Sequence, residues 1–176
     1  DVKGGLEFKN ITFDYPHMKL FDQLNLKIEP NELIVIIGRS GVGKSSIFDL
    51  LLRTIKTKKG EILLDGKDIS NYRKDSLRHH IAVVNQKPVL FSDTVLFNIL
   101  YGHPDKQLSL KEVYTVAKMV NIQKSILRLP GGFKTHLDEA GSKLSAGEIH
   151  RITIARAIIR NPKILLLDDP TTGLDT

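Results

Sequence analysis

The sequence predicts an α/β fold with an antiparallel β subdomain near the N-terminus and an α-helical subdomain inserted into the core. Three patterns support this prediction. Apolar and polar residues alternate in two stretches between residues 6 and 28, an apolar run leads through a glycine-rich stretch into a helical pattern at residues 33–52, and helical periodicity without strands fills residues 94–129. A chain of 176 residues with 41% hydrophobic residues can build such a core.

The N-terminal segment predicts two half-buried strands and a turn. Apolar and polar side chains alternate over residues 6–9 and 11–15, up to Pro16, and residues 24–28 repeat the alternation. A turn follows, in which Asn31 can take a left-handed conformation. The continuous apolar run 33–37 is then expected to be a buried strand that is parallel to its neighbours.

A glycine-rich stretch at residues 38–45 has the spacing G-x-x-x-x-G-K-S, the Walker A pattern. In this pattern backbone N–H groups and a helix N-terminus surround phosphates, while Lys44 reaches the β- and γ-phosphates and Ser45 ligates Mg²⁺. Side chains at Gly41 and Gly43 would crowd the phosphates. The core is therefore predicted to be a P-loop NTPase core of RecA-like type. The expected phosphate-binding residues are Gly38, Ser40, Gly41, Gly43, Lys44, Ser45 and Ser46.

Short elements are expected between this stretch and the helical region. They are, in order, a helix from Lys44 that closes at Lys59-Gly60, a strand at 61–64, a turn at Asp65-Gly66, a short helix at 75–80 and a buried strand at 81–86 that Lys87-Pro88 breaks.

Two capping boxes mark helices in the second half of the chain. Ser109 and Glu112 have the spacing that opens a helix, and so do Ser145 and Glu148, before a helix expected at 149–160. Asn161-Pro162 ends that helix, and the apolar run 164–167 predicts a strand. The expected organisation is a β-rich P-loop core of residues 1–87 and 161–176, with residues 88–160 as the inserted helical subdomain.

Acidic and amide side chains follow two of the predicted strands at their carboxyl ends, where parallel α/β sheets bind ligands. Asp168 after the strand 164–167 fits the Walker B pattern and is expected to hold Mg²⁺ together with Ser45. Asp169 is the candidate to polarise the attacking water, and Gln86 is placed to sense the γ-phosphate or Mg²⁺. Asp169, Gln86 and Lys44 are the predicted catalytic residues, and Ser45, Gln86 and Asp168 the predicted metal site.

The stretch Ser145-Ala146-Gly147-Glu148 predicts a second anion site. A helix N-terminus that follows a serine hydroxyl and small residues attracts anions, and this one is far in sequence from the glycine-rich stretch. The alternative is that this stretch is only the capped start of a helix and binds no anion.

Composition limits the classes of function. The formal net charge of +6 would suit nucleic acid, an anionic membrane surface or a nucleotide triphosphate, and charge alone does not choose among them. The basic residues are dispersed without an arginine-rich arm, which favours a solvated basic face, and no nucleic-acid partner is expected. The chain has no cysteine, which excludes disulfides, and its six histidines show no metal-ligand spacing. No apolar run approaches the 18 residues of a membrane span.

Taken together, these motifs resemble the nucleotide-binding domain of an ATP-binding cassette (ABC) transporter. Residues 144–148 are similar to the family signature LSGGQ or LSGGE, and residues 151–157 continue the pattern. Tyr15 matches the aromatic residue that stacks on adenine, Gln86 the Q-loop and residues 173–175 the D-loop. Residues 86–102 are similar to the exporter subgroup, and Lys143 with Glu148 resembles mitochondrial and heavy-metal-tolerance half-transporters.

The resemblance implies an ATPase that binds ATP and Mg²⁺ and powers an exporter through ATP-driven dimerisation. Each domain would supply Ser145 and Gly147 to the γ-phosphate held by its partner, either an identical or a different domain. A transmembrane domain is the second implied partner. It would hold the chain at a membrane, facing the cytosol or an organelle matrix.

Several departures from the family pattern leave alternatives open. Asp169 stands where the family has a catalytic Glu, which predicts slow turnover, and Ala146 replaces the first signature glycine. Asp138 and Ala140 replace the usual Gly and Arg, and the sequence stops before the expected switch histidine. A mainly regulatory, degenerate ATP-binding module is therefore the alternative. A soluble ABC protein acting on ribosomes or DNA is a second one, which the exporter-type Q-loop disfavours.

Overall fold

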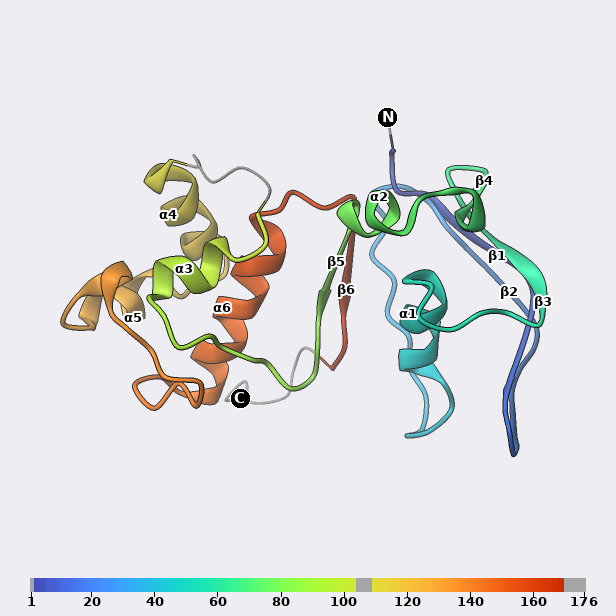
Figure 1. Ribbon diagram of the computed structural model, residues 1–176, viewed down its shortest axis with the longest axis horizontal. Helices are drawn as coiled ribbons and strands as arrows, with labels where there is room; N and C mark the ends of the chain where they lie inside the picture. Colours follow the sequence, from blue (N-terminus) through green and yellow to red (C-terminus); the bar gives the residue numbers. More distant parts are fainter. Residues whose placement is uncertain (1, 104–108, 170–176) are drawn as a thin grey trace. The chain divides into compact units, whose positions relative to one another are not determined.

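The computed structural model describes residues 2–103 and 109–169. The chain forms two compact units, Asp1–Ile81 and Ala82–Thr176, and Figure 1 shows the elements of each. The discontinuous organisation expected from the sequence, with residues 88–160 inserted between 1–87 and 161–176, stays a prediction.

The first unit contains an antiparallel sheet in the order β2-β1-β3-β4 (Figure 1). Its strands are β1 (Leu6–Tyr15), β2 (Met18–Ile28), β3 (Lys59–Leu64) and β4 (Lys67–Asp68). Leu6 and Phe8, and then Ile11 and Phe13, are buried at every second position of β1 on either side of Lys9 and Asn10, which confirms the predicted half-buried strand. The register shifts after Phe8, where Asn10 has a φ of 50°. The local bulge therefore keeps the apolar side chains on one face.

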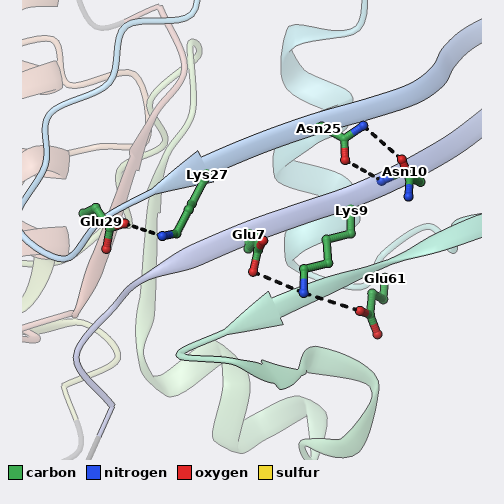
Figure 2. Close-up of polar contacts among 7 residues, drawn as sticks. All are labelled: Glu7, Lys9, Asn10, Asn25, Lys27, Glu29 and Glu61. Atoms are coloured by element: carbon green, nitrogen blue, oxygen red, sulfur yellow. Dashed lines mark hydrogen bonds and ion pairs between the residues drawn. The ribbon is translucent and has the colours of Figure 1, made fainter.

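Polar contacts cover part of this sheet, as Figure 2 shows. Lys9 Nζ lies 3.4 Å from Glu7 and 3.8 Å from Glu61 on the neighbouring strand. Asn10 and Asn25 exchange two hydrogen bonds, of 3.0 and 3.1 Å, across β1 and β2. Exposed ion pairs contribute little stability, so the Lys9 pairs add little to the stability of the sheet.

The apolar run Leu33–Ile37 is not a strand in the structure, which corrects the sequence-based expectation. The exposed fractions of Leu33, Val35 and Ile37 are 88, 73 and 90%, and those of Ile34 and Ile36 are both 37%. A strand needs a neighbour to complete its backbone hydrogen bonds, and within the described sheet of the first unit no strand pairs with these residues. The following turn prediction is confirmed, since Asn31 has a φ of 64°.

The helix after the glycine-rich stretch, α1 (Lys44–Leu51), is shorter than expected. Arg53 ends this region with a φ of 55° and its guanidinium donates to the carbonyls of Ile69 and Tyr72. Lys59-Gly60 therefore does not close the helix but opens β3. Gly60 has a φ of +86°, and a Cβ there would clash with the Lys9 carbonyl oxygen. The remaining elements of the unit are a 3-10 turn, Ile69–Asn71, and α2 (Lys74–His79).

The second unit combines a two-stranded sheet with helices. Its strands are β5 (Ile81–Val84) and β6 (Ile164–Leu167), and its helical elements are α3 (Val95–Leu100), α4 (Leu110–Met119), α5 (Gln123–Arg128), a 3-10 turn (Gly132–Lys134) and α6 (Ala146–Ile158). Both predicted capping boxes are present, at Ser109 with Glu112 and at Ser145 with Glu148. The second box opens α6 three residues earlier than the predicted start at Ile149.

Helix α6 belongs to both apolar cores of the second unit. Its residues Ile152 and Ala155 pack with α3 and α4, which lie beside it in Figure 1, and Ala157 packs with Ala82 and Val84 of β5. This double burial fixes the helix that Ser145 begins. In the part of the chain that the structure describes, no helix is long and apolar enough to cross a membrane.

Candidate phosphate-binding and catalytic site

The glycine-rich loop of the first unit has the backbone that a phosphate cradle requires. Gly41 and Gly43 have φ values of +81° and +97°, which side chains rarely allow. A Cβ at Gly41 would have no atom within 4 Å, whereas a Cβ at Gly43 would lie 2.8 Å from Leu20 Cγ. Gly43 is also the N-cap of α1 and has no side chain to cap it. The helix thus presents its first amides toward the loop.

Lys44 extends along this loop rather than away from it. Its ammonium group donates to the carbonyl oxygens of Gly38 and Arg39, both at 2.9 Å. An ammonium ion held by neutral carbonyls can exchange them for the more strongly binding oxygens of a phosphate. The loop, the lysine and the helix N-terminus therefore fit a polyphosphate.

Tyr15 lies next to the same helix. Its hydroxyl group is 3.3 Å from Oγ of Ser46, the third residue of α1, which is buried. Phe13 packs edge-on against the Tyr15 ring, with 5.0 Å between centroids and an interplanar angle of 85°. Tyr15 as a whole is 38% exposed. The structure therefore brings the predicted adenine-stacking residue to the predicted phosphate helix and leaves this residue partly exposed.

In the second unit, the ends of β5 and β6 bring Gln86 and Asp169 together. Gln86 Nε2 donates to Asp169 Oδ2 at 2.9 Å. The amide of Asp168 donates to the Val84 carbonyl at 2.9 Å, so the two strands end side by side. Asp169 has a φ of 50°, a conformation that short polar side chains tolerate. The predicted clustering of these strand ends is thus present.

The start of α6 is a complete capping box. Ser145 Oγ accepts a hydrogen bond from the Glu148 amide at 3.3 Å, and Glu148 accepts one from the Ser145 amide at 2.9 Å. Burial opposes ionisation of Glu148, yet hydrogen bonds from Ser125 and Ser145 outweigh it and hold the pKa of this carboxyl below its ordinary value. Ser145 is exposed and Gly147 is buried. The serine is therefore oriented at an accessible helix N-terminus.

The loop before this helix is closed by Asp138, one of the departures from the family pattern. Its carboxylate accepts hydrogen bonds from the amide and hydroxyl group of Ser142, at 2.9 and 2.6 Å. These bonds lower the pKa of Asp138. Gly141 takes a φ of +63°, and a Cβ there would lie 2.6 Å from Ile149 Cδ1 of α6. Asp138 thus organises the turn that leads to Ser145.

The predicted residues fall into three groups: Tyr15 with the loop of residues 38–46, Gln86 with Asp168 and Asp169, and Ser145 with Gly147. The predicted D-loop, residues 173–175, lies outside the described residues. Across residues 2–103 and 109–169, no three His, Cys, Asp or Glu side chains gather as a metal site.

Sequence reasoning missed one polar network in the second unit. Asn98 is 0% exposed although it lies within the apolar helix α3, and it connects Arg156 of α6 to the segment that follows Gln86. The signal for it was present, because a buried Asn on an apolar helix face must find hydrogen-bond partners.

Comparisons with known proteins agree with this geometry. A profile of the family described as "ABC transporter" matches residues 21–172. Multidrug resistance protein 1 of Entamoeba histolytica is 43% identical over 100% of this chain and 14% of its own length. Multidrug resistance protein pgp-1 of Caenorhabditis elegans is 40% identical over 98% of the chain and 13% of its own length. The chain thus spans only 13 to 14% of these two relatives.

A solved structure is similar over nearly the whole chain. It is described as a bacterial Atm1-family ABC exporter with ATP bound, and it is 40% identical to this sequence. The match has a TM-score of 0.90 and covers 99% of this chain and 30% of that one.

Proposed function

The chain belongs to the ABC transporter family as an ATP-binding domain of exporter type, and from this premise we propose that it binds MgATP and hydrolyses it to power export. The resemblance stated from the sequence is confirmed in this respect. One observation carries the proposal furthest. Lys44 lies across a loop whose glycines have positive φ angles and whose helix begins without a side-chain cap.

In this proposal Lys44 and the amides of the loop bind the β- and γ-phosphates. Lys44 exchanges the Gly38 and Arg39 carbonyls for phosphate oxygens, which are better acceptors for an ammonium ion. Tyr15 stacks on the adenine, and its hydrogen bond to Ser46 holds the ring near the helix. These contacts bind and orient the nucleotide.

Four further residues serve the metal ion and the attacking water. Ser45 and Asp168 would hold Mg²⁺, with Gln86 as a third contact, and the ion would neutralise charge on the phosphates. The Asp169 carboxylate would accept a hydrogen bond from the attacking water. Gln86 donates to that carboxylate, which fixes the rotation of its plane. Because Asp is shorter than Glu, we expect slow turnover.

Two partners complete the proposed function. A second ATP-binding domain receives Ser145 and Gly147 at its own γ-phosphate, supported here by the exposed Ser145 at a helix N-terminus. A transmembrane domain anchors the chain at a membrane, facing the cytosol or an organelle matrix. Nucleic acid is not among the proposed partners.

A regulatory module that binds ATP and scarcely hydrolyses it is the second candidate. It is favoured by Asp169 itself, whose carboxylate is shorter than the family's Glu. Ala146 at the first signature glycine favours it too. In that case the ATP-dependent dimer would form and persist.

One pair of measurements tests the proposal and separates the candidates. Labelled ATP with Mg²⁺ should bind the chain, and Lys44→Ala should weaken binding by about a hundredfold, as expected for removal of a charged hydrogen-bond donor of about 3 kcal/mol. Lys56→Ala, the same change at an exposed lysine of this unit, should leave binding unchanged. Equal affinity of wild type and Lys44→Ala would refute the site. Single-turnover hydrolysis in the full protein then distinguishes the ATPase from the regulatory module.

A further inference from the structure

The guanidinium group of Arg156 connects α6 to two points of the segment that follows Gln86. Its Nη1 donates to the Val89 carbonyl at 2.9 Å and its Nε to the Asn98 carbonyl at 2.7 Å. Nη2 donates to Asn98 Oδ1 at 2.9 Å. All three acceptors are neutral oxygens, so the group serves as a geometric fork rather than as half of an ion pair.

Asn98 extends this connection to residues 91–94, which precede α3. Its Oδ1 also accepts from the Phe91 amide at 2.8 Å, and its Nδ2 donates to the carbonyls of Phe91 and Thr94, both at 3.0 Å. The side chain is completely buried. A buried amide with its donors and acceptor satisfied holds one backbone conformation firmly, which here is that of residues 91–94.

Aromatic rings enclose the guanidinium group. Its carbon atom lies 5.1 Å from the Phe91 ring centroid and 5.8 Å from that of Tyr101. The two rings pack with 4.0 Å between centroids. Burial lowers the pKa of Arg156, but an arginine remains charged at neutral pH. The cation therefore adds to the attraction between α6 and this segment.

We infer that Arg156 and Asn98 form a clamp that positions Gln86 by fixing residues 89–98 to the helix that begins at Ser145. Gln86 lies three residues before Val89, and its amide meets Asp169. Helix α6 has 13 residues and is thus about 20 Å long. As a rigid element buried in two cores, it connects Ser145 at its start with the clamp in its last turn. Arg156 is a positioning residue, not a catalytic one.

The kinetic test uses the full protein and a double-mutant cycle, and rests on the proposed ATPase function. Arg156→Lys keeps the charge but loses the fork. It should lower kcat about tenfold and change KM for ATP less than about twofold, because a small misplacement of a catalytic group affects the rate more than binding. In a Gln86→Ala background the same change should lower kcat less than about twofold. Arg128→Lys, at an exposed arginine of α5, should leave kcat unchanged.

A loss of kcat by the same factor in both backgrounds would overturn the inference. So would a rise in KM together with a fall in Tm of more than about 5 °C, which would indicate a merely structural role.

Amide hydrogen exchange tests the clamp without any ATPase activity. Arg156→Lys should raise exchange at residues 87–93 about tenfold, with the Phe91 amide as the main reporter, while amides within α6 stay protected. Unchanged exchange at residues 87–93 would refute the clamp even in an active enzyme. If wild type hydrolyses no ATP, the proposed function fails and exchange still decides the clamp. If Arg156→Lys does not accumulate, Asn98→Ala, which removes the acceptor for the Phe91 amide and for Arg156 Nη2, should give the same exchange pattern.

Discussion

Gln86 donates a hydrogen bond of 2.9 Å to Asp169 although 83 residues separate them. The bond exists because β5 and β6 end side by side, with the Asp168 amide bonded to the Val84 carbonyl. This bond fixes the orientation of the Asp169 carboxylate. The proposed mechanism needs such a fixed orientation, because Asp169 would accept a hydrogen bond from the attacking water.

Gly43→Ala should destabilise the first unit more than a positive φ alone explains. The backbone strain of alanine at a φ of +97° is about 1 to 2 kcal/mol. The new Cβ would also lie 2.8 Å from Leu20 Cγ, and displacing that side chain adds about 1 kcal/mol or more. The free energy of unfolding, measured in urea, should fall by the sum. Gly66→Ala is the matched control, because Gly66 has a φ of +78° with no atom within 4 Å of its added Cβ. Equal losses in the two variants would show that Leu20 moves aside freely.

The positions of Gly43 and Ser145 were predictable because local patterns fix them. The G-x-x-x-x-G-K-S spacing and the capping boxes depend on residues within one or two helical turns, and the structure has each as predicted. Because these motifs depend only on neighbouring residues, the sequence alone was enough to predict them.

Other features depend on contacts that a sequence does not specify. Leu33–Ile37 has the composition of a buried strand but lies exposed, because a strand needs a partner that composition cannot name. The Arg156 fork depends on carbonyl oxygens of Val89 and Asn98, and backbone acceptors are the same at every residue. Only the apolar setting of Asn98 indicated that such a network exists.

Glu148→Gln should reduce the loss of stability in acid. Hydrogen bonds from Ser125 and Ser145 hold the pKa of Glu148 below its ordinary 4.5, in spite of burial. A depressed folded-state pKa stabilises the fold above about pH 4.5, and this contribution is lost as the pH falls through the folded-state value. Glutamine keeps the capping box without titrating, so the change in unfolding free energy at neutral pH should stay under about 1 kcal/mol.

Unfolding free energies measured from pH 6 to pH 3 should thus fall less steeply in Glu148→Gln than in wild type. Some slope will remain, because hydrogen bonds from Ser142 also depress the pKa of Asp138. Identical slopes would contradict a stabilising ionised Glu148.

Ser145→Arg should prevent ATP-dependent dimerisation without reducing ATP binding. Ser145 begins a helix that would face a partner's phosphate, and an arginine there would fill that space and remove the capping hydroxyl. Sedimentation with saturating MgATP should show a dimer for wild type and a monomer for the variant. The control is Ser76→Arg, at an exposed serine of α2, which should still dimerise. Ser142 is not used for the control, because its hydroxyl group donates to Asp138. A wild-type monomer at high concentration would count against the proposed ATP-dependent dimer.

Asp169→Glu should accelerate hydrolysis about ten- to a hundredfold without tightening ATP binding. Phosphoryl transfer depends on positioning and electrostatics, so the carboxylate acts by holding water in line with the γ-phosphate. One missing methylene withdraws it by about 1.5 Å, and a misplacement near 1 Å can slow a reaction about a hundredfold. Glutamate restores the reach, and Gln86, now 2.9 Å from the aspartate oxygen, can follow it by rotating its amide.

The variant belongs in the full protein, where turnover and single-turnover rates are both measurable, with Asp75→Glu at an exposed position of α2 as the control. Acceleration in a single turnover but not in steady state would place the slow step in domain opening. An unchanged single-turnover rate would mean that the aspartate already reaches the water, and the expectation of a slow chemical step would be wrong.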